Sequence, residues 1–146
     1  MIKNIFFSNI IVLASFLFLA ELKGNNNLTD KCQSTSHAEG TRFIRDFPVQ
    51  HTASSGSSPR VARYNIILHR GTTYRIYACN DESKPGEVII SLYRDDQFIA
   101  TSYDVDSDRH FPYIEYEVNA SGQFALELMF KGGKEGRAVG ILSTVE

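Results

Sequence analysis

Carboxylates gather in one short stretch of this sequence, and their spacing suits the binding of a hard cation. Asp104, Asp106 and Asp108 occupy alternate positions, and Glu115 follows eleven residues after the first of them. Calcium prefers about six to eight oxygen ligands, and the loop of an EF-hand supplies them at this spacing. An EF-hand itself is excluded because Arg109 stands where that loop requires glycine. The sequence predicts a calcium-binding loop in a β-protein, with a solvated aspartate-rich turn as the alternative.

Four tyrosines form a second candidate site, which would be a binding surface. We expect them at outward-facing positions of strands: Tyr77, Tyr93, Tyr103 and Tyr113. Aromatic rings with polar tips are common where proteins hold sugars or protein partners. The chain has no tryptophan, which weighs against a sugar platform. Tyrosines that pack on a second buried face, or that spread singly over the surface, are the alternative.

Motifs for catalysis are absent from the sequence. The four histidines lack the spacing of metal ligands, and no serine stands in a Gly-x-Ser-x-Gly turn. A catalytic triad can be assembled from distant residues, so a small secreted hydrolase is kept as the least favoured alternative. The prediction is a protein that is not an enzyme.

The two cysteines, Cys32 and Cys79, predict one disulfide, because an even pair in an exported protein is normally oxidised. The link closes a loop of 79 − 32 = 47 residues, which is worth about 4 kcal/mol on the chain-entropy model. The sequence has no Cys-x-x-Cys pair, so it predicts neither a zinc site nor a thioredoxin-like motif.

The N-terminus predicts export. Lys3 precedes an apolar run over residues 5–20, as in a secretory signal peptide. The run is shorter than the roughly 20 apolar residues of a membrane span. We expect a signal peptide over residues 1–24, a leader over residues 25–41 that Cys32 pins down, and no membrane span after processing. The predicted location is secreted or periplasmic, and an uncleaved anchor is the alternative.

Residues 42–146 alternate apolar and polar side chains in short runs, as half-buried β-strands do. The rows predicted to face inward are Tyr64, Ile66 and Leu68; Tyr74, Ile76 and Ala78; Val88, Ile90 and Leu92; Ile114, Tyr116 and Val118; and Phe124, Leu126, Leu128 and Phe130. Residues 42–49 predict an edge strand because they contain Pro48. Residues 137–144 are apolar on both faces, which predicts burial on both sides. The fold class predicted is an all-β, jelly-roll-like antiparallel sandwich of about eight strands.

Turn residues predict how some of these strands connect. The polar run 94–97 predicts a hairpin between the strand that starts at Val88 and the strand that follows. Gly71 and Thr72 predict a second antiparallel hairpin, between residues 61–70 and 73–78. Residues 50–60 are rich in serine and glycine and predict a flexible loop.

One succession of segments resembles a known family. The segments are Gly71-Thr-Thr-Tyr-Arg-Ile, Ile90-Ser-Leu-Tyr-Arg-Asp-Asp-Gln-Phe-Ile-Ala, Ser102-Tyr-Asp, Pro112-Tyr-Ile-Glu-Tyr-Glu-Val and Ala120-Ser-Gly-Gln-Phe-Ala-Leu-Glu-Leu. In this order they resemble the bacterial pre-peptidase C-terminal domain over residues 61–130. The resemblance implies a jelly-roll-like sandwich and a non-catalytic accessory module. No protease domain precedes the sandwich in this sequence, so the role of an appendage does not carry over unchanged.

The nearly balanced charge of the chain argues against two classes of partner. Lysine and arginine number 15 against 17 aspartates and glutamates, so no basic field is available for nucleic acid or an anionic membrane. The predicted function is that of an exported, non-catalytic binding module or accessory subunit, which presents its surface to a protein partner in the cell envelope or extracellular space. The alternative is a calcium-assisted carbohydrate-binding module.

Overall fold

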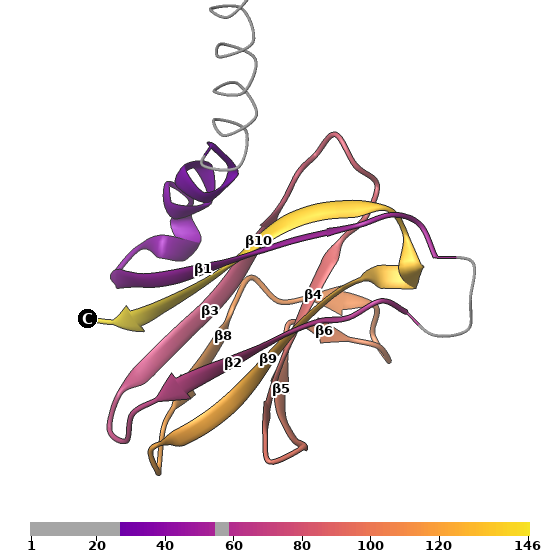
Figure 1. Ribbon diagram of the computed structural model, residues 1–146. Helices are drawn as coiled ribbons and strands as arrows, with labels where there is room; N and C mark the ends of the chain where they lie inside the picture. Colours follow the sequence, from indigo (N-terminus) through magenta and orange to yellow (C-terminus); the bar gives the residue numbers. More distant parts are fainter. Residues whose placement is uncertain (1–26, 55–58) are drawn as a thin grey trace, which may run out of the picture.

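The computed structural model describes residues 27–54 and 59–146 of the chain (Figure 1). The predicted signal peptide lies outside the described residues, and so does part of the predicted loop over residues 50–60. The described strands form two four-stranded antiparallel sheets and one two-stranded ribbon. No helix in the described ranges is long and apolar enough to cross a membrane.

The two large sheets contain strands from both halves of the chain. Sheet A consists, in spatial order, of β1 (Thr41–His51), β10 (Gly136–Val145), β3 (Thr73–Asn80) and β8 (Ile114–Glu117). Sheet B consists of β2 (Ala62–Leu68), β9 (Gly122–Phe130), β4 (Val88–Arg94) and β5 (Gln97–Thr101). The ribbon consists of β6 (Tyr103–Asp104) and β7 (Arg109–His110), and two 3-10 turns are η1 (Ser36–Ala38) and η2 (Lys131–Gly133).

The pairing scheme is that of a jelly roll. β1 pairs with β10, β2 with β9, β3 with β8 and β4 with β5, always antiparallel. The chain therefore folds back on itself as one long hairpin, in which early strands pair with late strands. This hairpin is wound so that its four strand pairs form two sheets packed face to face. The predicted fold class, an all-β jelly-roll-like sandwich, is confirmed.

Alternation along the strands builds the core. The five rows predicted to face inward do lie between the two sheets, and Leu68, Ile76, Leu92, Leu126 and Leu128 have no exposed surface. β10 is buried on both faces, as predicted, because Ala138 and Leu142 face the core while Val139 and Ile141 belong to a second buried cluster. β1 is an edge strand, and a bulge between Phe43 and Arg45 shifts its register.

One of the two predicted hairpins is wrong. Residues 62–68 and 73–80 do not pair with each other, because β2 pairs with β9 while β3 pairs with β10 and β8. The turn at Gly71, whose φ is +81°, instead carries the chain from sheet B to sheet A. The hairpin between β4 and β5 is confirmed. Asp95 and Asp96 adopt φ values of 49° and 60°, as a two-residue turn of type I′ requires.

The described part of the predicted leader, from residue 27 on, packs on the fold. Residues 27–33 are helical, η1 follows, and together they lie against the outer face of sheet A (Figure 1). Cys32 forms the predicted disulfide with Cys79 of β3, with a Cα–Cα distance of 5.6 Å. Cys32, Tyr77, Val139 and Ile141 are buried together in this second cluster. We call residues 27–40 the N-terminal cover.

Candidate protein-binding surface

The structure does not bring the four predicted surface tyrosines to one face. Tyr77 points to the outer side of sheet A, but the N-terminal cover leaves it only 1% exposed, and this burial raises the pKa of its phenol. Tyr93 packs edge-on against Phe98 on sheet B, with ring centroids 5.9 Å apart. Tyr113 precedes β8 in sheet A, and Tyr103 lies in the two-stranded ribbon. Tyrosine positions spread over three sheets do not make a common aromatic platform.

Asp104 holds its own turn together. Its Oδ1 accepts the Asp106 N–H at 3.0 Å, and its Oδ2 accepts the Ser107 hydroxyl at 2.7 Å. The Ser107 hydrogen bond, with that of Asp106, lowers the pKa of the Asp104 carboxyl. This is the aspartate-rich turn that we considered as the alternative to a calcium loop.

Two of the other predicted calcium ligands have partners of their own. Asp108 contacts Lys131, and Glu115 contacts Arg75. Within residues 27–54 and 59–146, no group of three or more His, Cys, Asp or Glu side chains could hold a metal ion. The geometry therefore gives the predicted calcium site no support.

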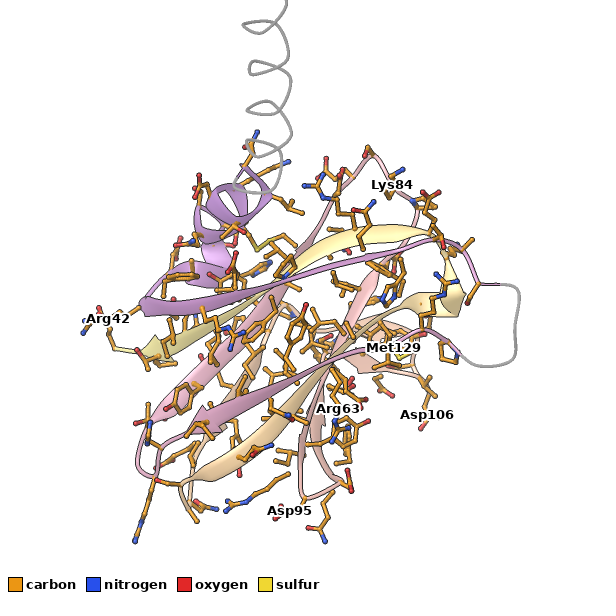
Figure 2. All side chains as sticks on the ribbon, viewed as in Figure 1. Arg42, Arg63, Lys84, Asp95, Asp106 and Met129 are labelled. Atoms are coloured by element: carbon orange, nitrogen blue, oxygen red, sulfur yellow. A yellow bond between two sulfur atoms is a disulfide. The ribbon has the colours of Figure 1, made fainter. Side chains whose placement is uncertain are left out.

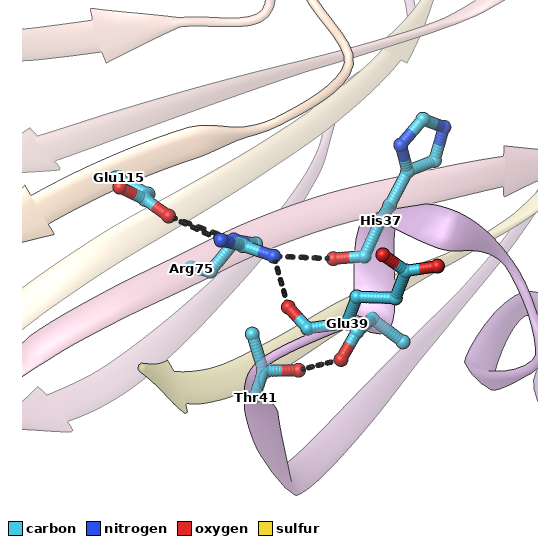
Figure 3. Close-up of polar contacts among 6 residues, drawn as sticks. His37, Glu39, Thr41, Arg75 and Glu115 are labelled. Atoms are coloured by element: carbon cyan, nitrogen blue, oxygen red, sulfur yellow. Dashed lines mark hydrogen bonds and ion pairs between the residues drawn. The ribbon is translucent and has the colours of Figure 1, made fainter. Parts of the chain in front are cut away.

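Glu115 belongs to a clamp that fastens the N-terminal cover to sheet A (Figure 3). Arg75 donates from Nε and Nη2 to Glu115 Oε1 at 2.8 and 2.6 Å. Its Nη1 donates to the carbonyl oxygens of His37 and Glu39 at 2.9 and 2.8 Å. The guanidinium also lies over the ring of Tyr113, 4.3 Å from its centroid. Glu115 and Tyr113 therefore have a structural role beside Arg75.

Residues 103–110, which we call the acidic hairpin, are braced against the sandwich by side chains from other elements. The Tyr103 hydroxyl and Lys131 Nζ both donate to Asp108 Oδ1, each at 2.5 Å. His110 Nε2 lies 2.9 Å from Glu87 Oε2, and its ring is 4.7 Å from that of Tyr103. The hairpin is thereby tied to the start of β4 and to the end of β9.

Charge stabilises the same brace. The hydrogen bonds from Lys131 and Tyr103 lower the pKa of the Asp108 carboxyl, and Asp108 raises the pKa of Lys131. The hydrogen bond that the Tyr103 hydroxyl donates to Asp108 raises the pKa of Tyr103. At neutral pH, Asp108 is therefore a carboxylate held between a cation and a neutral phenol.

The tip of the acidic hairpin is free to contact another molecule. Val105 is 75% exposed between two aspartates, and Asp106 points away from the sandwich (Figure 2). The residues that follow the hairpin add Phe111 and Tyr113, which are 39% and 37% exposed. Three exposed apolar or aromatic side chains thus come from one stretch of nine residues. Exposed apolar side chains such as these are candidate contacts for a protein partner.

A cavity of about 420 Å³ adjoins the base of the acidic hairpin, and we call it the edge cleft. It lies beside the end of β3 and is lined by, among others, Ala78, Asn80, Glu87, Ser102, His110 and Phe111. Serine, histidine and glutamate are residue types that hydrolases use. Here the Ser102 Oγ accepts the Ile90 N–H at 2.9 Å, and within the described ranges no hydrogen bond joins it to His110. The cleft therefore lacks the nucleophile–base contact of a catalytic triad.

Comparison with known proteins places the chain by its fold. No known protein family matches the sequence, so none assigns a pre-peptidase C-terminal domain to it, and no curated protein matches it either. A solved structure that is similar is PliG from Aeromonas hydrophila, a periplasmic inhibitor of g-type lysozyme. The two share 11% sequence identity with a TM-score of 0.50, over 68% of this chain and 84% of PliG. At this identity the likeness concerns the β-sandwich fold.

Four of the site residues that the sequence predicts belong to the acidic hairpin, but the residues that brace the hairpin were not predicted. Tyr103, Asp104, Asp106 and Asp108 were all predicted, and they do lie together in the acidic hairpin. The brace from Glu87 and Lys131 was missed because these residues are distant in the sequence, and only the fold brings them to Asp108 and His110. Val105 carried a readable signal, since it is an isolated apolar residue between two aspartates in a turn.

Proposed function

We propose that this chain is an exported, non-catalytic binding module whose acidic hairpin docks on a protein partner. The observation that carries the proposal is a projecting hairpin that is braced by Lys131 and Glu87 and presents Val105 in the open. A braced loop loses little conformational freedom when it binds, so more of the contact energy is retained as affinity. The neighbouring Phe111 and Tyr113 extend the surface that a partner would cover.

The partner that we propose is a glycan-cleaving enzyme of the lysozyme kind. The support is the similarity in fold to PliG, which is an inhibitor of g-type lysozyme. A module of this kind works by occupying the partner's surface, and it needs no reactive group of its own.

Export fits the same proposal. The Cys32–Cys79 disulfide is typical of proteins in an oxidising compartment. The first residues of the sequence have the composition of a signal peptide, and PliG is a periplasmic protein. We therefore place the mature chain in the periplasm or outside the cell, where a lysozyme would meet it.

The experiment is a titration of a g-type lysozyme with the purified mature chain, followed by calorimetry and by the rate of cell-wall hydrolysis. We expect saturable binding and inhibition of hydrolysis. Val105→Ser should weaken binding about tenfold, because burial of one valine side chain is worth on the order of 1.5 kcal/mol. The matched control is Ile67→Ser, since Ile67 is 59% exposed on the outer face of sheet B. The proposal fails if the lysozyme is not bound, or if both variants weaken binding equally.

A further inference from the structure

The last residues of β3 pair with β10 on one side and with no strand of the described chain on the other. β3 continues to Asn80, but β8 pairs with it only from Thr73 to Ile76. If the same register continued, Pro112 would lie opposite Ala78. Proline has no amide hydrogen and cannot donate to a sheet ladder. The proline therefore ends the pairing and leaves an open edge on an interior strand of sheet A.

The hydrogen-bond pattern shows which backbone groups face this open edge. Asp81 N–H donates to Arg137 O at 2.7 Å on the β10 side, and Val118 N–H donates to Thr72 O at 3.1 Å on the β8 side. Backbone N–H and C=O groups along an antiparallel strand point alternately to its two sides. Odd-numbered residues of β3 therefore pair with β10, and even-numbered residues face β8. Ala78 and Asn80 present their backbone groups to the side that β8 has left.

These groups have no substitute partner. Among the described residues, no backbone or side-chain hydrogen bond reaches the amide or the carbonyl of Ala78 or Asn80 from that side. The edge cleft lies directly against them, since Ala78 and Asn80 are part of its lining. Its volume of about 420 Å³ is room for a few residues of extended chain.

Another edge of the sandwich is protected where this one is not. β1 is the outer strand of sheet A, but it contains Pro48 and a bulge beside Ile44. The Tyr64 hydroxyl also donates to Pro48 O, which occupies a carbonyl on that strand. Prolines and bulges are the devices by which proteins prevent unwanted strand pairing. Along residues 78–80 the open strand carries neither device.

We propose that the edge cleft binds an extended peptide segment of the partner, which continues the line of β8 and pairs with Ala78 and Asn80 of β3. This inference rests on the proposed function and adds to it a mode of recognition, β-strand addition. The rim of the cleft carries the Glu87 carboxylate, whose Oε2 lies 2.9 Å from His110 Nε2 and whose side chain is still 57% exposed. A peptide with a lysine or arginine beside an apolar residue fits this lining, since the apolar side chain can lie over Val88 and the cation can reach Glu87.

The probe is a capped seven-residue peptide of alternating lysine and valine, titrated into isotope-labelled protein and followed by amide shifts and hydrogen exchange. We expect the amides of Ala78 and Asn80 to exchange rapidly in the free protein and to become protected as the peptide binds. Tyr77 and Cys79, on the same strand, should be protected throughout because they pair with β10. The same peptide with alternate amides N-methylated should not bind. Slow exchange at Ala78 and Asn80 in the free protein, or no response to about 5 mM peptide, a concentration above a millimolar dissociation constant, would overturn the inference.

A variant separates this inference from the proposed function. Ala78→Pro removes the free amide at the edge, and Val105→Ser alters only the tip of the acidic hairpin. We expect Ala78→Pro to abolish peptide binding and Val105→Ser to leave it unchanged. If Val105→Ser weakens lysozyme binding while Ala78→Pro, folded by its circular dichroism, binds both probes normally, the hairpin proposal stands and the edge inference is wrong. If Ala78→Pro does not fold, the exchange measurement on the unaltered chain decides.

Discussion

β3 takes part in two regions that differ in how they are covered by the rest of the chain. Its outward face is covered by residues 27–40, which are held by a disulfide and by the two hydrogen bonds from Arg75 to the carbonyl oxygens of His37 and Glu39. Its edge beyond Ile76 is left open and is flanked by a projecting hairpin. The comparison teaches that apolar surface on a β-sandwich is not in itself a binding site. The chain covers one part of β3 with its own N-terminal segment, and the uncovered part is the one that we propose for a partner.

The largest effect should follow from breaking the covered region at its covalent link. Replacing both Cys32 and Cys79 with alanine should lower the free energy of unfolding by about 4 kcal/mol, because the unfolded chain regains the freedom of a 47-residue loop. Denaturant unfolding at equilibrium measures this. Binding through the acidic hairpin should survive in the folded fraction, since both cysteines pack in the cluster under the N-terminal cover. Equal loss of stability and of affinity would mean that the two regions are not separate.

Removing the clamp should have the next largest effect. Arg75 has a side chain that is only 12% exposed, and Arg75→Met would leave two carbonyls of the N-terminal cover without their donor. We expect a loss of about 2 kcal/mol, the usual worth of hydrogen bonds that involve a charge. Glu115→Gln is the matched control, because Arg75 keeps its bonds to the carbonyls of His37 and Glu39. The control should lose well under about 1 kcal/mol, as exposed ion pairs do. An equal loss of stability in the two variants would show that the Arg75–Glu115 ion pair, and not the hydrogen bonds to the N-terminal cover, carries the contribution of Arg75.

The smallest effect concerns the brace of the acidic hairpin, and it depends on pH. The pKa of Asp108 is lowered in the folded chain, so its contribution is present above the ordinary value of 3.8 and is lost as the pH falls through the lowered pKa. We expect amide exchange in residues 103–110 to accelerate over that acidic range, relative to strands of the core. Asp108→Asn should show the fast exchange already at neutral pH. The account of the brace is wrong if this variant leaves the exchange of the hairpin unchanged.

Alternation in the sequence predicted each inward row because strand geometry alone decides which face a side chain takes. It could not predict which strands pair, and the hairpin expected at Gly71 was wrong because the chain crosses between sheets there. The outward direction of Tyr77 followed from the same alternation, but its burial depends on where residues 27–40 settle. In the same way, the partners of Asp108 and Glu115 were invisible until folding brought Lys131 and Arg75 beside them. Pro112 was visible in the sequence, but its effect on the edge of β3 required the register.

The most direct test of the central claim is a differential capture experiment. The mature chain and its Val105→Ser variant are immobilised side by side and exposed to the envelope and secreted fractions of the source organism, and bound proteins are compared by quantitative mass spectrometry. We predict that at least one glycan-cleaving enzyme is retained by the unaltered chain and is strongly depleted on the variant. Identical sets of retained proteins on the two surfaces would contradict the claim that the acidic hairpin is the docking element.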